Sequence, residues 1–118
     1  MVQVSTKEVM EKFNLQLVSG QEGIGRYITT SDISRPGLEM AGYFTHYPAN
    51  RVQLLGKTEL SFFEMLPKKD KVDRMYKLCT PNTPAIIIAR GLEVPEELIE
   101  ASAEANVPVL VSKLPTTQ

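Results

Sequence analysis

The sequence predicts an α/β fold with a central, mostly parallel sheet, a βαβαβ core flanked by helices. Three short apolar runs support this prediction, at residues 52–55, 85–89 and 107–111. Amphipathic segments with helical spacing separate the runs, and a glycine turn follows the first run at Gly56. A strand, a glycine turn and a helix in this order are typical of a βαβ unit. We therefore expect the three runs to be neighbouring parallel strands, with the residues before Arg51 added to that sheet.

The composition is that of one globular domain spanning residues 1–118. The chain carries a net charge of −1 and 42% hydrophobic residues, which is ordinary for a soluble domain with its own core. This charge argues against a general nucleic-acid binder, which needs a basic face. One cysteine and one histidine cannot supply a structural zinc site. Because the sequence shows no leader and no apolar run of membrane-spanning length, we expect a cytoplasmic protein with no nucleic-acid or membrane partner.

The first helix is expected to begin at Ser5, whose side chain can cap it while Glu8 reaches back. Its expected buried face consists of Val9, Met10 and Phe13. Asn14 should end it, because asparagine tolerates a left-handed backbone. A short strand over residues 15–18, a turn containing three glycines and an extended piece over residues 26–29 should follow.

The stretch before the first core strand has no clean hydrophobic period. Pro36 favours an extended conformation for the residue before it. We expect a short helical turn next, and then a loop carrying His46 and Tyr47. His46 stands alone in an aromatic stretch, so we expect it to pack or to face solvent rather than to bind a ligand.

Two helices are expected between the first and second core strands. Thr58 should be the N-cap of the first helix, and Pro67 should end it. The expected inner face of this helix carries Phe62, Met65 and Leu66, with Phe63 beside them. The second helix has apolar residues spaced i, i+3, i+4 and i+7, namely Val72, Met75, Tyr76 and Cys79. Because buried free cysteines are common and no basic partner is evident, we expect Cys79 to be a core residue.

The second core strand is apolar throughout, which is typical of a strand covered on both faces. We therefore expect Ile87→Ala to cost about 2–5 kcal/mol of stability. The last helix should begin near Pro95, with acidic residues in the first turn where the helix dipole favours them. Its expected inner face carries Leu98, Ala101 and Ala105. Asn106 should end it before the third core strand.

The run Gly56-Lys57-Thr58 looks like the end of a phosphate-binding P-loop. A full P-loop needs another glycine five residues before Gly56, and that position is Arg51. We therefore interpret this run as a strand-to-helix turn. The core strand ends offer no aspartate for a phosphoacceptor, and we expect no catalytic or metal-binding residues in this chain.

A possible anion-binding site is predicted at the carboxyl edge of the sheet. Each parallel strand is followed by a cation, so Lys57, Arg90 and Lys113 should meet at that edge. Thr58 adds the free N–H groups of a helix N-terminus. The alternative is that these cations follow the strands simply because loops are solvated.

Three stretches carry a resemblance to a known family, at residues 31–44, 51–63 and 83–88. In them the sequence resembles the N-terminal domain of HPr kinase/phosphorylase from Gram-positive bacteria. The resemblance covers essentially the whole chain, with long runs of unlike residues matching in order. It implies a fold similar to the UDP-binding first domain of Mur ligases.

The resemblance also implies what the full-length enzyme does. It is a bifunctional protein-serine kinase and phosphorylase that acts on the phosphocarrier protein HPr in carbon catabolite repression. It uses ATP or pyrophosphate with Mg²⁺ and assembles as a homohexamer. The family's P-loop, catalytic residues and HPr-binding signature lie beyond residue 118, so the catalytic P-loop domain is absent from this chain. We therefore expect the chain to hold no cofactor and to be inactive by itself, with its own catalytic domain and HPr as partners in the full-length enzyme.

Two hypotheses remain open for the chain's own role. One is a structural or regulatory module that positions the kinase domains. The other is a module that binds a small molecule or nucleotide phosphate, inherited from the Mur-like fold. An apolar surface patch that becomes buried in the full enzyme would favour the first, and a specific ligand at the strand ends would favour the second.

Overall fold

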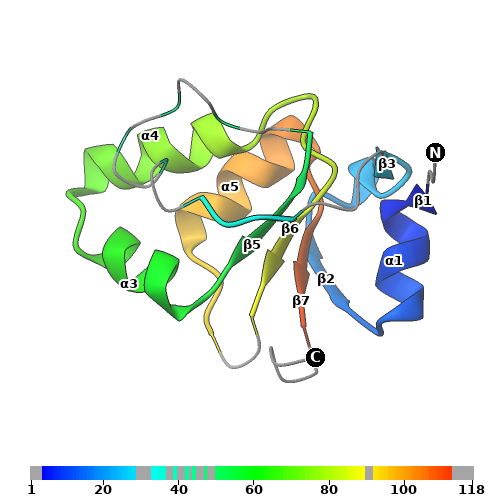
Figure 1. Cartoon of the computed structure of the whole chain (residues 1–118). Helices are drawn as coiled ribbons and strands as arrows, with labels where there is room; N and C mark the ends of the chain where they lie inside the picture. Colours follow the sequence, from blue (N-terminus) through cyan, green and yellow to red (C-terminus); the bar gives the residue numbers. More distant parts are fainter. Residues whose placement is uncertain are drawn as a thin grey trace.

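A computed structural model describes residues 4–28, 33–36, 39, 42, 44, 47, 50–89 and 92–112 of the chain (Figure 1). The elements in chain order are β1 (Val4–Ser5), α1 (Thr6–Lys12), β2 (Gln16–Ser19), the 3₁₀ helix η1 (Gln21–Gly23), β3 (Tyr27–Ile28), β4 (Ile33–Ser34), β5 (Val52–Leu55), α3 (Lys57–Glu64), α4 (Lys68–Leu78), β6 (Ile86–Ile88), α5 (Glu96–Ala105) and β7 (Val109–Val111).

The central sheet has five strands in the order β2-β7-β6-β5-β4. Strands β4, β5, β6 and β7 are parallel to their neighbours, and β2 pairs antiparallel with β7 at one edge. Strands β1 and β3 form a separate antiparallel pair. The predicted α/β class and the three neighbouring parallel core strands are therefore confirmed. The sequence interpretation missed β1 and β4, which are each two residues long.

The main core lies between one face of the sheet and the helices α3, α4 and α5, which gather on the same side (Figure 1). Leu55, Ile86 and Ile88 point to this helix face, since alternate residues of a strand share a face and the register pairs Leu55 with Ile88. All three are fully buried. Helix α5 contributes Leu98 and Ala101 to the same cluster. We call this side of the sheet the helix face.

The opposite side of the sheet carries Leu54, Ile87 and Leu110, which are aligned across β5, β6 and β7. Helix α1 lies on this side (Figure 1), and we call it the α1 face. Leu110 is fully buried, whereas Leu54 and Ile87 are only partly buried. Ile33 aligns with Val52 on the same face and is 58% exposed. The expectation that the second core strand is covered on both faces therefore holds at Ala85 and Ala89, which are buried, and is incomplete at Ile87.

Helix α1 begins where the sequence predicts, but the side of the helix that is buried differs from the prediction. Ser5 is the N-cap, and its Oγ accepts a hydrogen bond from the N–H of Glu8 at 3.1 Å while the Glu8 carboxylate accepts from the N–H of Ser5. The buried residue of α1 is Thr6, whose hydroxyl donates to the carbonyl of Pro84 at 2.8 Å. Phe13, which was expected to be buried, is 51% exposed. A polar contact thus joins α1 to the sheet, whereas Val9 and Met10 are only partly buried and Phe13 remains at the surface.

The expected inner faces of the next two helices are wrong in part. In α3 the buried residues are Leu60 and Phe63, while Phe62 and Met65 are exposed, Met65 by 80%. In α4 the buried residues are Met75 and Leu78, and Tyr76 is exposed. The Tyr76 hydroxyl donates to the Glu104 carboxylate of α5 at 2.7 Å, so this side chain lies across the helix pair rather than beneath it.

The last helix and the cysteine follow the prediction. In α5 Leu98 and Ala101 are fully buried, and Asn106 ends the helix in the left-handed conformation with φ of 57°. Cys79 is buried in the core cluster, as expected.

Arg26, just before β3, links the N-terminal part of the chain to the loop between α4 and β6 and to the end of α5. Its guanidinium donates to the carbonyls of Thr80 at 3.2 Å, Thr83 at 2.7 Å and Ala105 at 2.9 Å. Thr80 and Thr83 lie in the loop between α4 and β6, and Ala105 is the last residue of α5. A single side chain therefore ties this loop and the end of α5 to β3. Because a guanidinium offers five donors in a rigid fork, few other residues could make this connection.

Candidate functional site

The structure describes only part of the predicted anion site. Lys57 and Thr58 are the first two residues of α3, directly after β5, and both are exposed. Arg90 and Lys113 lie outside the described residues. The structure therefore places the α3 half of the site at the carboxyl end of a parallel strand, as expected, and leaves the meeting of the three cations a prediction.

The N-terminus of α3 already holds a carboxylate of the chain itself. Gly56, not Thr58, is the N-cap, so the expected cap is wrong. The Glu59 Oε1 atom accepts a hydrogen bond from the N–H of Gly56 at 2.7 Å and another from Arg35 Nη2 at 3.0 Å. A glutamate three residues after the cap can reach back in this way, whereas the Thr58 side chain is too close to the helix start to do so. The carboxylate occupies a place where a bound anion would meet the helix dipole.

The ion pair of Arg35 and Glu59 sets the electrostatics of this turn. Burial by itself would raise the pKa of Glu59, but the hydrogen bonds from Arg35 and Gly56 outweigh it and hold the pKa below its ordinary value. The Glu59 side chain is 8% exposed and that of Arg35 is 54% exposed. Hence Glu59 stays ionised near neutral pH, and its charge offsets one of the cations that would attract a phosphate.

The turn is also too crowded to wrap a phosphate as a P-loop does. The guanidinium of Arg35 lies directly over Gly56, where a Cβ atom would collide with it. Arg51, at the position of the missing glycine, immediately precedes β5. A P-loop needs successive backbone N–H groups that point at the phosphates, and here the N–H of Gly56 is bonded to Glu59. The interpretation of residues 56–58 as a strand-to-helix turn is therefore confirmed.

Two titratable groups, the buried Cys79 and the partly buried Tyr47, lie at the C-terminal end of α4. Burial raises the pKa of the Cys79 thiol to about 12, so the thiolate that a nucleophile needs is scarce at neutral pH. Burial likewise raises the pKa of Tyr47, whose hydroxyl donates to the carbonyl of Leu78 at 2.8 Å. Both groups serve packing and hydrogen bonding in the core.

Metal-binding clusters and membrane-spanning helices are both lacking from the described part of the chain. Within those residues there is no group of three or more histidine, cysteine, aspartate or glutamate side chains placed to hold a metal ion. The described helices include none that is both long and apolar enough to span a membrane.

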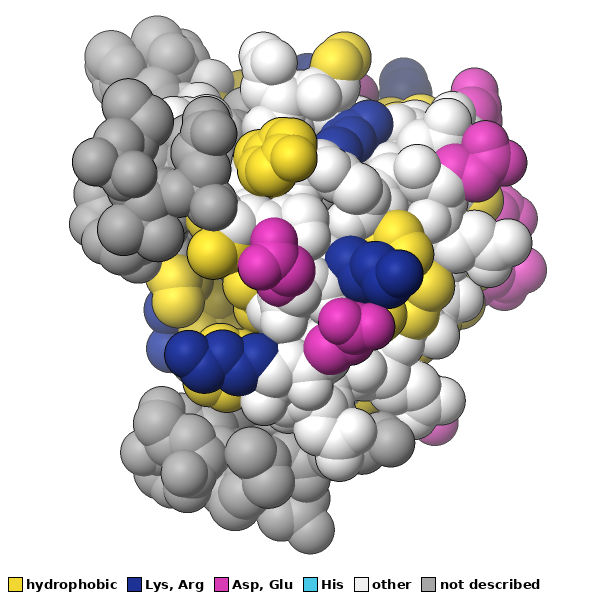
Figure 2. Space-filling view, turned by 90° about the vertical axis from the view of Figure 1, so that its right-hand side faces the viewer, with side chains coloured by type: hydrophobic (Ala, Val, Ile, Leu, Met, Phe, Trp, Pro, Cys, Tyr) yellow, Lys and Arg dark blue, Asp and Glu magenta, His cyan; other side chains and the backbone are white. Residues whose placement is uncertain are grey.

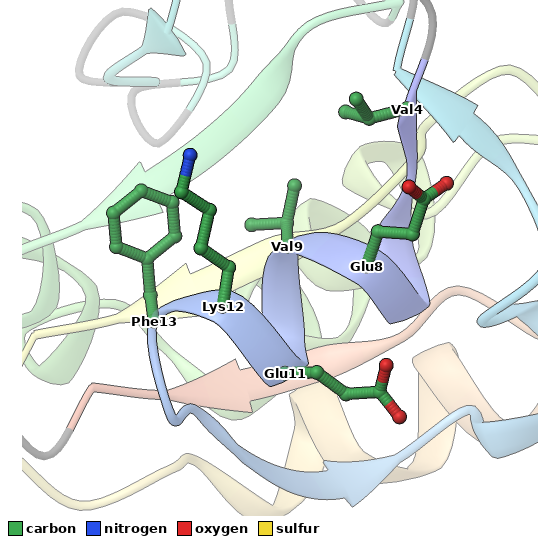
Figure 3. A pocket seen from close by; sticks show the side chains of 6 residues that line it. All are labelled: Val4, Glu8, Val9, Glu11, Lys12 and Phe13. Atoms are coloured by element: carbon green, nitrogen blue, oxygen red, sulfur yellow. The ribbon is translucent and has the colours of Figure 1, made fainter.

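A surface hollow of about 480 Å³ lies against α1 (Figure 3). The described residues that line it are Val4, Glu8, Val9, Glu11, Lys12 and Phe13. Val9 and Phe13, one helical turn apart, point to the same side of α1, while Glu11 points away from them. Seen from the α1 side, hydrophobic atoms lie recessed among acidic and basic side chains (Figure 2). The hollow thus has an apolar wall and a charged rim.

The sequence interpretation took Val9 and Phe13 for core residues and so missed this surface. Their i, i+4 spacing predicts an apolar face of the helix. It does not show whether that face packs against the same chain or against another protein. The run of charged residues around them, Glu8, Glu11 and Lys12, was the available signal, because it leaves only a narrow apolar stripe. Lys12 Nζ lies 5.8 Å from the centre of the Phe13 ring, close enough for a cation–π contact.

Comparison with known proteins finds one matching family and close relatives over the full length of the chain. The family described as HPr Serine kinase N terminus matches residues 4–118. The chain is 66% identical to the HPr kinase/phosphorylase of Bacillus pumilus, 64% to that of Bacillus subtilis and 65% to that of a Geobacillus species, in each case over all 118 residues. It spans 38% of the length of each of these relatives.

Proposed function

Because this chain belongs to the family of HPr serine kinase N-terminal domains, we propose that it is the non-catalytic, structural and regulatory module of an HPr kinase/phosphorylase. The observation that carries this proposal is the carboxylate of Glu59 at the start of α3. It takes up the N-terminus that in a nucleotide-binding βαβ unit would face phosphate. In this chain the turn is stabilised by internal hydrogen bonds of Glu59 to Gly56 and Arg35.

The wider activity belongs to the full-length protein. There the module is joined to a catalytic domain that transfers phosphate to and from a serine of HPr, in carbon catabolite repression. That domain uses ATP or pyrophosphate with Mg²⁺, and the whole acts in the cytoplasm as a homohexamer with a Mur-ligase-like first domain. The turn after β5 does not fit a nucleotide triphosphate held with its metal as in a P-loop, because Arg35 and Glu59 close it. Nucleotide chemistry is therefore assigned to the remainder of the protein.

An activity assay tests whether phosphoryl transfer requires the part of the protein outside this chain. The 118-residue chain and the full-length protein are incubated separately with ATP, Mg²⁺ and HPr, and phospho-HPr is separated and quantified. We expect phosphorylation with the full-length protein and none above a protein-free blank with the chain alone. Phospho-HPr formed by the chain alone would contradict the proposal.

A weak anion site at the start of α3 is the second candidate. Two observations favour it: the exposed guanidinium of Arg35 lies over Gly56, and Lys57 is exposed beside it. The ligand would be a phosphorylated small molecule, bound near Thr58 and competing with Glu59 for Arg35. The predicted contributions of Arg90 and Lys113 belong to this same proposal.

An NMR titration tests the anion site. Inorganic phosphate, UDP and fructose 1,6-bisphosphate are added to the labelled chain, to Lys57→Ala and to Lys69→Ala, which removes an exposed lysine from α4. Saturable shifts over residues 56–59 that are absent only from Lys57→Ala are the expected result. Shifts scattered over the surface, or equal in all three proteins, would rule the site out.

A further inference from the structure

We propose that the α1 face docks the part of the full-length polypeptide that follows residue 118, an inference that rests on the proposed function. The docking surface consists of the apolar side of α1, with Val9 and Phe13, and the open positions of the sheet beside β4, with Ile33 and Leu54. The occupant is the remainder of the same protein, which the HPr kinase/phosphorylase relatives possess beyond the 38% matched here.

The proposed docking surface carries large apolar side chains that the described residues leave exposed or only partly buried. Phe13 is 51% exposed and Ile33 58% exposed, although both side chains are large and hydrophobic. Leu54 and Ile87 lie in central strands of the sheet and are still only partly buried. Exposed large apolar side chains on one side of a sheet, with charged residues around part of them, are typical of an interaction site. The hollow against α1 gives this surface a concave shape into which a side chain from a partner could insert.

The position at which the described chain ends favours the following polypeptide as the occupant. Val111, the last residue of β7, pairs with Gln16, three residues after Phe13. The N–H of Ser112 donates to the carbonyl of Ile88 at 3.0 Å, so the main chain is bonded to the sheet up to this residue. Whatever follows is therefore tethered beside the C-terminal end of α1. A short tether gives a partner an effective concentration in the millimolar range, which a separate molecule rarely reaches.

The charged rim also fits a contact within one polypeptide. Glu8, Glu11 and Lys12 surround the apolar wall of the hollow. Interfaces between domains of one chain are more polar than obligate interfaces between subunits. Permanent homodimers usually meet through more hydrophobic surfaces than one with this charged rim. A second copy of this chain is therefore the less suitable occupant.

Hydrogen exchange measured by mass spectrometry tests the docking. The 118-residue chain and the full-length protein are compared under the same conditions, and exchange is followed over residues 6–14 and over residues 60–66 as an internal reference. We expect α1 to exchange on the order of tenfold more slowly in the full-length protein, which corresponds to about 1.4 kcal/mol of added local stability. The reference segment at the end of α3 should exchange equally in both.

Matched variants then locate the contact. Phe13→Asp and Ile33→Asp each place a charge on the docking surface, and Met65→Asp places one on a still more exposed apolar residue at the end of α3. In the full-length protein the first two should abolish the added protection of α1, and the third should leave it intact. Because all three residues are exposed, the melting temperature of the 118-residue chain should be nearly unchanged, which separates lost docking from lost folding.

Three results would overturn the proposal. They are equal exchange of α1 in the two proteins, loss of protection in Met65→Asp to the same extent as in Phe13→Asp, and protection in the 118-residue chain that rises with its concentration. The last result would mean that a second copy covers the face. The readout does not depend on activity, so a full-length protein that fails to phosphorylate HPr would refute the proposed function and still report whether α1 is covered.

Discussion

The two faces of the central sheet differ in how completely the chain covers them. On the helix face Leu55, Ile86 and Ile88 are fully buried beneath α3, α4 and α5. On the α1 face the neighbouring residues of the same strands, Leu54 and Ile87, are only partly buried. The three-residue strand β6 thus alternates between a closed and an open environment within one apolar run.

This difference shows what each face contributes. The helix face stabilises the chain, because burial of large apolar side chains is the main favourable contribution to folding. The α1 face is held by polar contacts, chiefly Thr6 to Pro84 and Arg26 to three carbonyls, and some of its apolar residues, such as Phe13 and Ile33, remain exposed. We infer that stability and interaction are divided between the two sides of one sheet.

The largest effect is expected from paired substitutions in β6. Ile88→Ala should lower the free energy of unfolding by about 2–5 kcal/mol, as a large-to-small change at a fully buried site. Ile87→Ala removes the same atoms from a partly covered site, so it should cost about half as much. Urea denaturation of both variants measures the difference. An Ile87→Ala cost equal to or above that of Ile88→Ala would mean that the α1 face is as closed as the helix face.

The next effect concerns the connection between the two sides. Arg26→Ala should destabilise the chain by about 1.5–3 kcal/mol, because three carbonyls lose a charged donor. Lys7→Ala, an exposed cation on α1, is the control and should change little. Thermal denaturation of the two variants tests this, and equal melting temperatures would show that Arg26 does not hold the loops.

A pH-dependent effect is expected at the turn between β5 and α3. Glu59→Ala should cost about 1 kcal/mol at neutral pH, as loss of a helix cap. Because the pKa of Glu59 in the folded state lies below its ordinary value of 4.5, the carboxylate stabilises the fold above that pH. Its contribution is lost as the pH falls through the lowered pKa of the folded state.

Urea denaturation between pH 3 and pH 7 follows this loss. The stability difference between wild type and Glu59→Gln should be constant from about pH 6 to pH 7 and shrink below about pH 4.5. Glu64→Gln, the same change at the exposed end of α3, is the control. A difference that grows on acidification would contradict the assigned sign.

The smallest effect is expected at the surface of α1. Phe13→Ala should change the stability of the 118-residue chain by less than about 0.5 kcal/mol, as is usual for exposed positions. Phe63→Ala, at a fully buried aromatic of α3, should cost about 3–5 kcal/mol. If Phe13→Ala were as costly as Phe63→Ala, Phe13 would belong to the core, as the sequence interpretation expected.

The core strands could be predicted from the sequence because each is a short apolar run bounded by turn residues. Strand β4 could not, since two residues carry no period and Ile33–Ser34 is a strand only through its pairing with β5. The start of α1 was predictable because its cap is made by Ser5 and Glu8, three residues apart. Local signals thus sufficed wherever the interaction itself was local.

The orientation of the helices and the details of the site depended on distant partners. In α3 the pairs Phe62 with Met65 and Leu60 with Phe63 have the same spacing, and only packing on the sheet selects the second pair. Glu59 lies three residues after its cap, but its second partner, Arg35, comes from 24 residues earlier. Nothing in the local pattern identifies that contact.

We infer that this chain closes one face of its sheet and leaves the other for a partner. Solvent paramagnetic relaxation of isoleucine methyl groups in the 118-residue chain tests it most directly. We expect strong relaxation at Ile33, an intermediate effect at Ile87 and almost none at Ile86 and Ile88. Protection of Ile33 and Ile87 equal to that of Ile88 would contradict the claim.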